Sequence, residues 1–235
     1  MSRRLQIGEV VLGERPRLVA AGGDAEVEAL LAADGADLVE LRADLFDDSH
    51  PAAVTAALAR LRTGTRPVIL TVRHAREGGR AMPDDRRRAL YDAGRPHTHA
   101  IDVEIASAEA FAPVVQQARD DGRLVILSAH FHDGTPDLGT LLGLVARADA
   151  LGAHLTKLVT TATSPADVRL LLEATLAAAP RPVATFAMGP LGVGSRVLFG
   201  LAGSLLTYGS VGRPTAPGQL AIGELRAWVD RFHPA

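Results

Sequence analysis

The stretch AHLTKLVTTATSPADVRLLLEATLAAAPRPVATFAM, residues 153–188, holds one complete strand–helix–strand unit. Its two ends, residues 153–159 and 182–188, are short apolar runs typical of strands that are buried on both faces. The segment between them, residues 164–179, has the apolar periodicity of a helix. Ser164, followed by a proline, predicts where that helix begins, because serine is a frequent N-cap and proline suits the first helical position. Two strands joined by a helix indicate parallel pairing.

The same alternation of strands and helices continues along the rest of the chain. Further strand-like runs lie at residues 17–21, 36–42, 67–73, 100–106, 123–130 and 205–211. Further helix-like segments include residues 24–35, 51–62, 83–94 and 136–152. Eight strand–helix units of roughly 30 residues predict an α/β fold of the (β/α)8 TIM-barrel type. We expect a single barrel domain over residues 1–235, with a short strand or hairpin at residues 5–12 before the barrel.

A doubly wound parallel sheet is the alternative architecture for such a sequence. Sheets of that kind that bind dinucleotides carry a glycine fingerprint after the first strand, and this chain has none there. GPLGVGSR at residues 189–196 contains G-x-G but lacks the third glycine at the required offset. The barrel therefore remains the favoured interpretation.

Composition and charge narrow the classes of function. The formal net charge is −2 and no long run of one sign occurs, so we expect neither a nucleic-acid partner nor a membrane partner. The absence of cysteine excludes disulfides and thiolate metal sites. No signal peptide and no run of roughly 20 apolar residues is present, which predicts a cytoplasmic protein. The basic cluster Arg86–Arg88 is interpreted as the solvated face of a helix, and Trp228 as a packing residue of the last helix.

Lys157 is the only lysine among the 25 lysines and arginines of the chain, and it lies inside a predicted strand. Arginine stays protonated, whereas lysine can lose its proton when it is desolvated or placed beside other cations. The free amine is a nucleophile that attacks a ketone or aldehyde to form an imine. The alternative is a lysine that extends from a strand end toward solvent. Because surface lysines are otherwise absent, we favour the imine hypothesis.

Charged side chains gather where the predicted strands end. In a (β/α)8 barrel the catalytic groups lie at the carboxyl ends of the strands. The charged residues that we predict at these ends are Glu40, Arg42, Arg73, His130, Lys157 and Arg196. His130 can serve as a proton shuttle near neutral pH, and Glu77 could hold its imidazole by a hydrogen bond. The arginines indicate an anionic substrate, such as a carboxylate gripped by two N–H groups. His130 and His132 face one side of a strand, but no third histidine lies nearby, so no metal site is predicted.

Several stretches carry a resemblance to a known family. They are DLVELRAD, ILTVRHAREGG, AIDVEIA, SAHFHDGTP, GAHLTKLV, FAMGPLGVGSR and GSLLTYGSVGRPTAPGQ. In this order and at this spacing, the sequence resembles the type I 3-dehydroquinate dehydratases of the shikimate pathway, which leads to chorismate and the aromatic amino acids. The resemblance covers essentially the whole chain. It implies a hydro-lyase reaction, from 3-dehydroquinate to 3-dehydroshikimate, on a barrel without a cofactor.

The resemblance also implies roles for individual residues. Lys157 matches the imine-forming lysine, His130 the general acid/base and Glu77 the carboxylate partner of that histidine. The implied substrate-binding residues are Glu40, Arg42 and Arg73 around the ring hydroxyls, Arg196 and Gln219 at the carboxylate, Met188 and Tyr208 in the pocket wall, and Thr215 in a lid at residues 213–219. A homodimer is implied as well.

One motif departs from the family pattern. The family usually has His-Asp-Phe or His-Asn-Phe where this chain has His130-Phe131-His132. Two alternatives therefore stay open. One is a diverged paralogue that binds a shikimate-like ligand with weak or no turnover. The other is a class I aldolase, which also uses a barrel lysine and an imine, although the stretch VGRPTAPGQ lacks the glycine cluster of a phosphate-binding loop.

Overall fold

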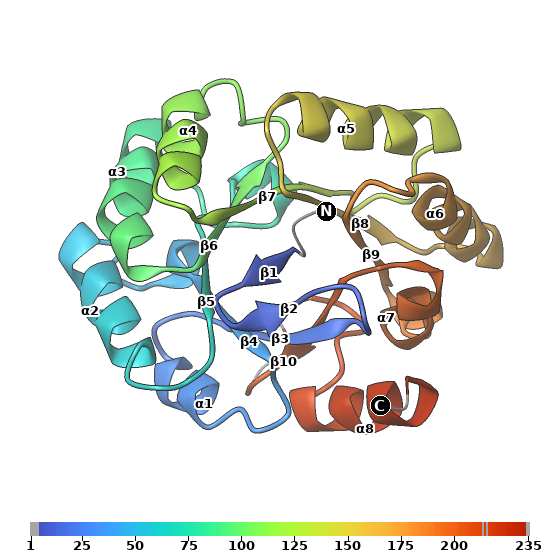
Figure 1. The fold of residues 1–235 in the computed structure, drawn as a ribbon, viewed down its shortest axis with the longest axis horizontal. Coiled ribbons are helices and arrows are strands. Elements are labelled where there is room, and N and C mark those ends of the chain that lie inside the picture. The colour runs from blue at the N-terminus through green and yellow to red at the C-terminus, as the bar shows by residue number, and fades with distance from the viewer. Residues whose placement is uncertain (1–4, 213, 215, 234–235) are drawn as a thin grey trace.

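The computed structural model describes residues 5–212, 214 and 216–233 and contains one sheet of eight parallel strands (Figure 1). In spatial order the strands are β10 (Leu206–Ser210), β3 (Arg17–Gly22), β4 (Leu38–Arg42), β5 (Val68–Thr71), β6 (Ala100–Glu104), β7 (Leu124–His130), β8 (Leu155–Thr161) and β9 (Val183–Met188). The Leu205 N–H donates to the Val183 carbonyl at 2.8 Å, which brings the last strand back toward β9. The predicted (β/α)8 barrel is confirmed.

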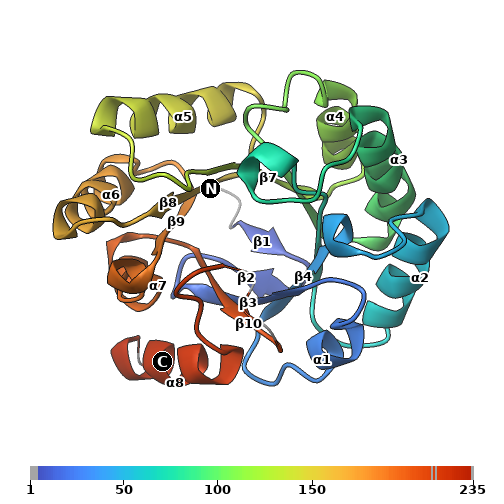
Figure 2. The same cartoon turned by 180° about the vertical axis from the view of Figure 1, so that it is seen from behind.

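Helices surround the barrel on its outside (Figures 1 and 2). They are α1 (Val27–Leu31), α2 (Pro51–Leu61), α3 (Asp84–Gly94), α4 (Ala112–Asp120), α5 (Leu138–Ala150), α6 (Pro165–Ala177), α7 (Ser195–Leu198) and α8 (Ile222–Phe232). The predicted start of α6 is confirmed, because the Ser164 side chain accepts from the Asp167 N–H and Asp167 accepts from the Ser164 N–H.

Helix α1 is much shorter than the helix-like segment at residues 24–35. Acidic side chains at its start bind loop backbone instead of continuing the helix. Glu26 accepts the Gly23 N–H at 2.9 Å, and Asp24 accepts the N–H groups of Ala25 and Asp47. Such local hydrogen bonds offer the backbone an alternative to helical pairing, so the first turn of the predicted helix is lost.

The apolar core has two layers, one inside the barrel and one between the strands and the helices. The inner layer includes Ile69 and Ile126, together with Ile7 and Leu12 from the N-terminal segment. That segment forms the hairpin β1 (Gln6–Ile7) and β2 (Val10–Val11), which confirms the predicted hairpin at residues 5–12. Since its Ile7 is fully buried in the inner layer, the hairpin closes one end of the barrel and leaves the other end for a site.

Two predictions about individual side chains are wrong. Arg87 does not lie on a solvated face: it is fully buried between α3 and the barrel, where it pairs with Glu104. Its position at i, i+3, i+4 and i+7 with Leu90, Tyr91 and Gly94 places it on the inner stripe of the helix. Trp228 is not packed into the core either, because it is 46% exposed on α8.

Candidate active site

One cavity at the carboxyl ends of the strands collects the predicted site residues. It is lined by Glu40, Arg42, Arg73, Glu77, His130, Lys157, Met188, Arg196, Tyr208 and Gln219. These side chains come from five strands (β4, β7, β8, β9 and β10), from the loops after β5 and β10, and from helix α7. Thr215 lies outside the described residues. The structure therefore brings together every predicted site residue that it describes.

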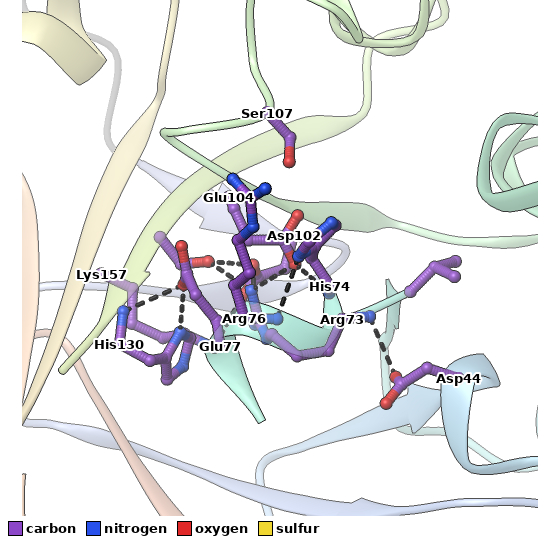
Figure 3. A network of polar contacts seen from close by, with 12 residues as sticks. Asp44, Arg73, His74, Arg76, Glu77, Asp102, Glu104, Ser107, His130 and Lys157 are labelled. Atoms are coloured by element: carbon purple, nitrogen blue, oxygen red, sulfur yellow. Dashed lines mark hydrogen bonds and ion pairs between the residues drawn. The ribbon is translucent and has the colours of Figure 1, made fainter. Parts of the chain in front are cut away.

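Lys157 projects from β8 into this cavity and is almost fully buried. Its Nζ lies 2.5 Å from Asp102 Oδ2 and 3.8 Å from Glu40 Oε2 (Figure 3). The ring of Tyr208 lies 4.6 Å from the same nitrogen. The nearest charged groups are thus carboxylates, whereas the sequence interpretation placed the lysine among arginines. Lys157 thus forms a buried ion pair with Asp102.

His130 ends β7 and is held by Glu77 from the loop after β5. The imidazole Nδ1 lies 2.9 Å from Glu77 Oε2, and the same oxygen accepts the His130 backbone N–H at 3.0 Å. Burial, followed by the charges of Arg73 and Lys157, lowers the pKa of His130 well below its ordinary value. The imidazole is therefore neutral at pH 7. With Nδ1–H donated to Glu77, Nε2 is free to accept a proton.

The carboxyl group of Glu77 also has a pKa that is shifted from its ordinary value. Burial raises its carboxyl pKa to about 7, against the opposing charge of Arg73. A carboxyl group with that pKa changes charge within the working range of an enzyme. Glu77 can therefore change charge beside His130, whose Nδ1 lies 2.9 Å from Glu77 Oε2.

Asp102 and Glu104, both on β6, were not among the predicted site residues. Asp102 Oδ1 accepts from Arg73 Nη2 at 3.0 Å and from Ser128 Oγ at 2.6 Å, while Glu104 Oε1 lies 3.0 Å from Arg73 Nη1. Although burial raises the pKa of Asp102, the charges of Arg73 and Lys157 lower it to about 2. A signal was present in the sequence. Two acidic residues spaced i, i+2 in an apolar strand must share the inner face of the barrel.

Arg42 and Arg73 line the cavity, but carboxylates already occupy much of their hydrogen-bonding capacity. Arg42 binds Asp44 through two parallel bonds, from Nε at 2.9 Å and from Nη2 at 2.7 Å. Asp44 is almost fully buried and also accepts the Arg73 N–H at 3.0 Å. Their contact with substrate stays a prediction.

Arg196 differs from the other cations of the cavity. It is 1% exposed and lies 4.8 Å from the centre of the Phe186 ring. Its Nη1 donates to the Tyr208 carbonyl at 3.2 Å, but Nε and Nη2 have no hydrogen-bond partner among the residues that the structure describes. Burial lowers its pKa to about 10. A buried cation whose N–H donors have no partner lowers the free energy of unfolding unless an anion binds it.

Two kinds of feature, a cluster of side chains that could hold a metal ion and a long apolar helix, are absent from the described residues. Within residues 5–212, 214 and 216–233, no three His, Asp or Glu side chains come together in a way that could hold a metal ion. No helix in those ranges is both long enough and apolar enough to cross a bilayer.

Comparison with known proteins gives a consistent result. The sequence signature of the family described as type I 3-dehydroquinase matches residues 21–233. A 3-dehydroquinate dehydratase of Methanococcoides burtonii is 35% identical over 228 residues, covering 94% of this chain and 97% of that protein. One of Klebsiella pneumoniae is 39% identical over 207 residues, covering 83% and 82%.

Solved structures agree with the sequence matches. The crystal structure of 3-dehydroquinate dehydratase from Geobacillus kaustophilus has a TM-score of 0.90 and 31% identity, covering 98% of this chain and 96% of that chain. The type I 3-dehydroquinate dehydratase from Clostridium difficile, solved with covalently modified comenic acid, has a TM-score of 0.90 and 30% identity, covering 98% of each chain.

Proposed function

The chain belongs to the type I 3-dehydroquinase family, and from that premise we propose that its Lys157 forms an imine with the ketone of 3-dehydroquinate. Its reaction is that of a hydro-lyase, which removes water from 3-dehydroquinate to give 3-dehydroshikimate. The observation that carries the residue assignment is the meeting of Lys157 with a neutral, carboxylate-held His130 in one cavity.

The proposed route assigns each proton to a group. The amine of Lys157 attacks the ketone carbon, and loss of water gives the protonated imine, which keeps the one positive charge of the starting ammonium group. His130 then removes a proton from the adjacent carbon, and the electron pair forms an enamine. The enamine expels the hydroxyl group, which leaves as water with the proton that His130 returns. Hydrolysis of the imine releases the product and restores Lys157.

Glu77 and Asp102 support this route from opposite sides. When His130 takes up a proton, the Glu77 carboxylate 2.9 Å from Nδ1 stabilises the imidazolium. Asp102, 2.5 Å from Nζ, fixes the position of the lysine before reaction and pairs with its charge. Arg196 is our candidate for binding the substrate carboxylate, because two nitrogens of its buried guanidinium have no hydrogen-bond partner among the described residues.

Borohydride trapping tests the proposal directly. Reduction in the presence of 3-dehydroquinate should leave a covalent adduct on Lys157, identified by mass spectrometry of the digested protein. Dehydration also creates a conjugated enone acid with new ultraviolet absorbance, whereas aldol cleavage does not. Folded, pure protein that shows turnover but no adduct on Lys157 contradicts the imine route. Binding without turnover favours the diverged paralogue.

We also propose a single-domain, cytoplasmic homodimer that uses the outer face of α6, α7 and α8. Within the described part of the chain, every large apolar side chain that is exposed lies on these helices or in the turns just before and after α7: Leu176, Leu191, Leu198, Leu201, Trp228 and Phe232. Contiguous exposed apolar surface typically marks an interface. Light scattering should therefore report a dimer, which Leu198→Asp dissociates while Gln116→Asp, on the exposed face of α4, does not. A monomeric wild-type protein contradicts this proposal.

A further inference from the structure

We propose that Arg87, on the outer helix α3, is a positioning residue for Lys157 and acts through a chain of buried charges that crosses the barrel wall. The inference rests on the proposed imine chemistry of Lys157. It adds a residue outside the barrel to the machinery, and Arg87 itself touches neither the cavity lining nor any group that we assign to substrate.

The side chain of Arg87 is held from several directions. Its Nε and Nη2 donate to the Val72 carbonyl at 3.2 and 3.0 Å, and Nη2 also makes a short contact with Glu104 Oε2. Its Nη1 donates to Asp84 Oδ1 at 3.0 Å, and the ring of Phe111 lies 4.6 Å from the guanidinium carbon. A fully buried arginine with this many partners is fixed in one geometry.

Glu104 links Arg87 to the charged residues inside the barrel. Its Oε2 faces Arg87, while its Oε1 accepts from Arg73 Nη1 at 3.0 Å and from the His74 N–H at 2.8 Å. Arg73 Nη2 then binds Asp102 Oδ1 at 3.0 Å, and Asp102 Oδ2 lies 2.5 Å from Lys157 Nζ (Figure 3). Cation and anion alternate at every step from α3 to the reactive amine.

Each inner member of this series of buried charges has an oppositely charged neighbour on both sides. Glu104 lies between two arginines, Arg73 between two carboxylates, and Asp102 between Arg73 and Lys157. All of these side chains are at most 3% exposed, so water screens them little. Removing Arg87 leaves Glu104 with one cationic partner. Arg73 is then drawn toward Glu104, and Asp102 and Lys157 must adjust.

Arg87 also controls the backbone that carries Arg73. Val72, whose carbonyl accepts two of the Arg87 N–H groups, directly precedes Arg73 in the chain. The Val72 N–H in turn donates to the Tyr91 hydroxyl at 3.1 Å, one helical turn beyond Arg87 on α3. The same helix therefore fixes both the peptide and the charge that set the place of Arg73. Lysine can supply the charge but not this planar fork.

The test compares three variants at position 87 with a neighbouring control. Arg87→Met removes the charge and all hydrogen bonds, Arg87→Gln removes the charge but keeps one NH2 donor group, and Arg87→Lys keeps the charge without the fork. Arg86→Met is the control, because Arg86 is exposed on the same helix and donates to the Ser49 carbonyl. For each folded variant, kcat, KM and the single-turnover rate of borohydride trapping on Lys157 are measured.

Positioning predicts a lower rate of imine formation in the molecules that are folded. We expect the trapping rate and kcat to fall about tenfold or more in Arg87→Met, with KM within about twofold of wild type and partial recovery in Arg87→Lys. Arg86→Met should behave as wild type. If Arg87→Met does not fold, Arg87→Gln decides the matter by the same rates.

Wild-type trapping rates in folded Arg87→Gln or Arg87→Met overturn the positioning role. A variant that has fewer active molecules but an unchanged trapping rate in those molecules also overturns it, because that pattern reports stability alone. Failure of the imine chemistry itself is separately visible. In that case the wild-type protein forms no adduct, which overturns both proposals, whereas an adduct in the wild type with equal rates in the variants overturns only this one.

Discussion

Replacing Arg196 with methionine should make the protein more stable and less active. Methionine fills a similar volume without a charge, and the guanidinium that it replaces is 1% exposed. In the free protein two of its donors have no partner among the described residues. The charge is therefore a cost to folding that only a bound anion offsets.

The expected gain in the free energy of unfolding follows from the pKa of Arg196. Burial lowers the pKa of Arg196 from 12.5 to about 10. At 1.36 kcal/mol per pH unit, this difference corresponds to about 3 kcal/mol of destabilisation wherever the side chain is charged. Arg196 is charged below about pH 10, so the cost is present throughout the neutral range. Loss of the bond to the Tyr208 carbonyl removes about 1 kcal/mol, which leaves a net gain of about 2 kcal/mol.

Activity should change in the opposite direction. Losing one partner of a buried, hydrogen-bonded charge pair costs about 2–5 kcal/mol, so kcat/KM should fall by about 30-fold to 4,000-fold. Urea unfolding gives the stability, and absorbance of the enone acid gives the rate. Arg87→Met is the matched control for stability, because that equally buried arginine has carboxylate partners and its loss should destabilise the fold. A destabilised Arg196→Met with wild-type kcat/KM would refute the reasoning.

Three further outcomes are expected. Lys157→Arg keeps the charge beside Asp102 but cannot form an imine, so turnover should fall to background and no borohydride adduct should appear; near-wild-type activity would show that the position needs only a cation. In the wild type, kcat/KM should fall as the pH drops through about 7, where Glu77 takes up a proton, and Glu77→Gln should remove this step from the pH profile. Asp102→Asn should lower the free energy of unfolding by about 3 kcal/mol, because buried Lys157 and Arg73 lose a shared anion; denaturation at wild-type urea concentrations would contradict this.

Periodicity was sufficient to predict the barrel, because its strands and helices each bury a repeating apolar face. The unusual use of lysine was sufficient to single out Lys157. The partners of these residues were harder to predict, since they depend on how neighbouring strands are aligned. Thr71 pairs with Asp102 and Ser128 pairs with Lys157, and this register sets the inner faces of β6, β7 and β8 around one cavity. No single stretch of sequence contains that information.

Arg87 shows a different limit. Its spacing to Leu90, Tyr91 and Gly94 did carry a signal, but a run of three arginines suggested a solvated surface more strongly than the helical period suggested burial. A buried arginine needs partners from other elements, and these were Glu104 on β6 and the Val72 carbonyl after β5. A run of charged residues in the sequence is therefore weaker evidence that a side chain is exposed than the position of that residue on the helix.

The balance of charge in the cavity gives the proposed substrate one orientation. Lys157, Arg73 and Arg42 each pair with a protein carboxylate, whereas the only hydrogen-bond acceptor of Arg196 among the described residues is the Tyr208 carbonyl. A substrate carboxylate that bound at Arg42 or Arg73 would have to compete with Asp44 or Asp102. At Arg196 it would satisfy donors that are otherwise unused. We therefore propose that an anion held there leaves the ketone end of the molecule to reach Lys157, and that the uneven pairing of the cations orients the reacting carbonyl.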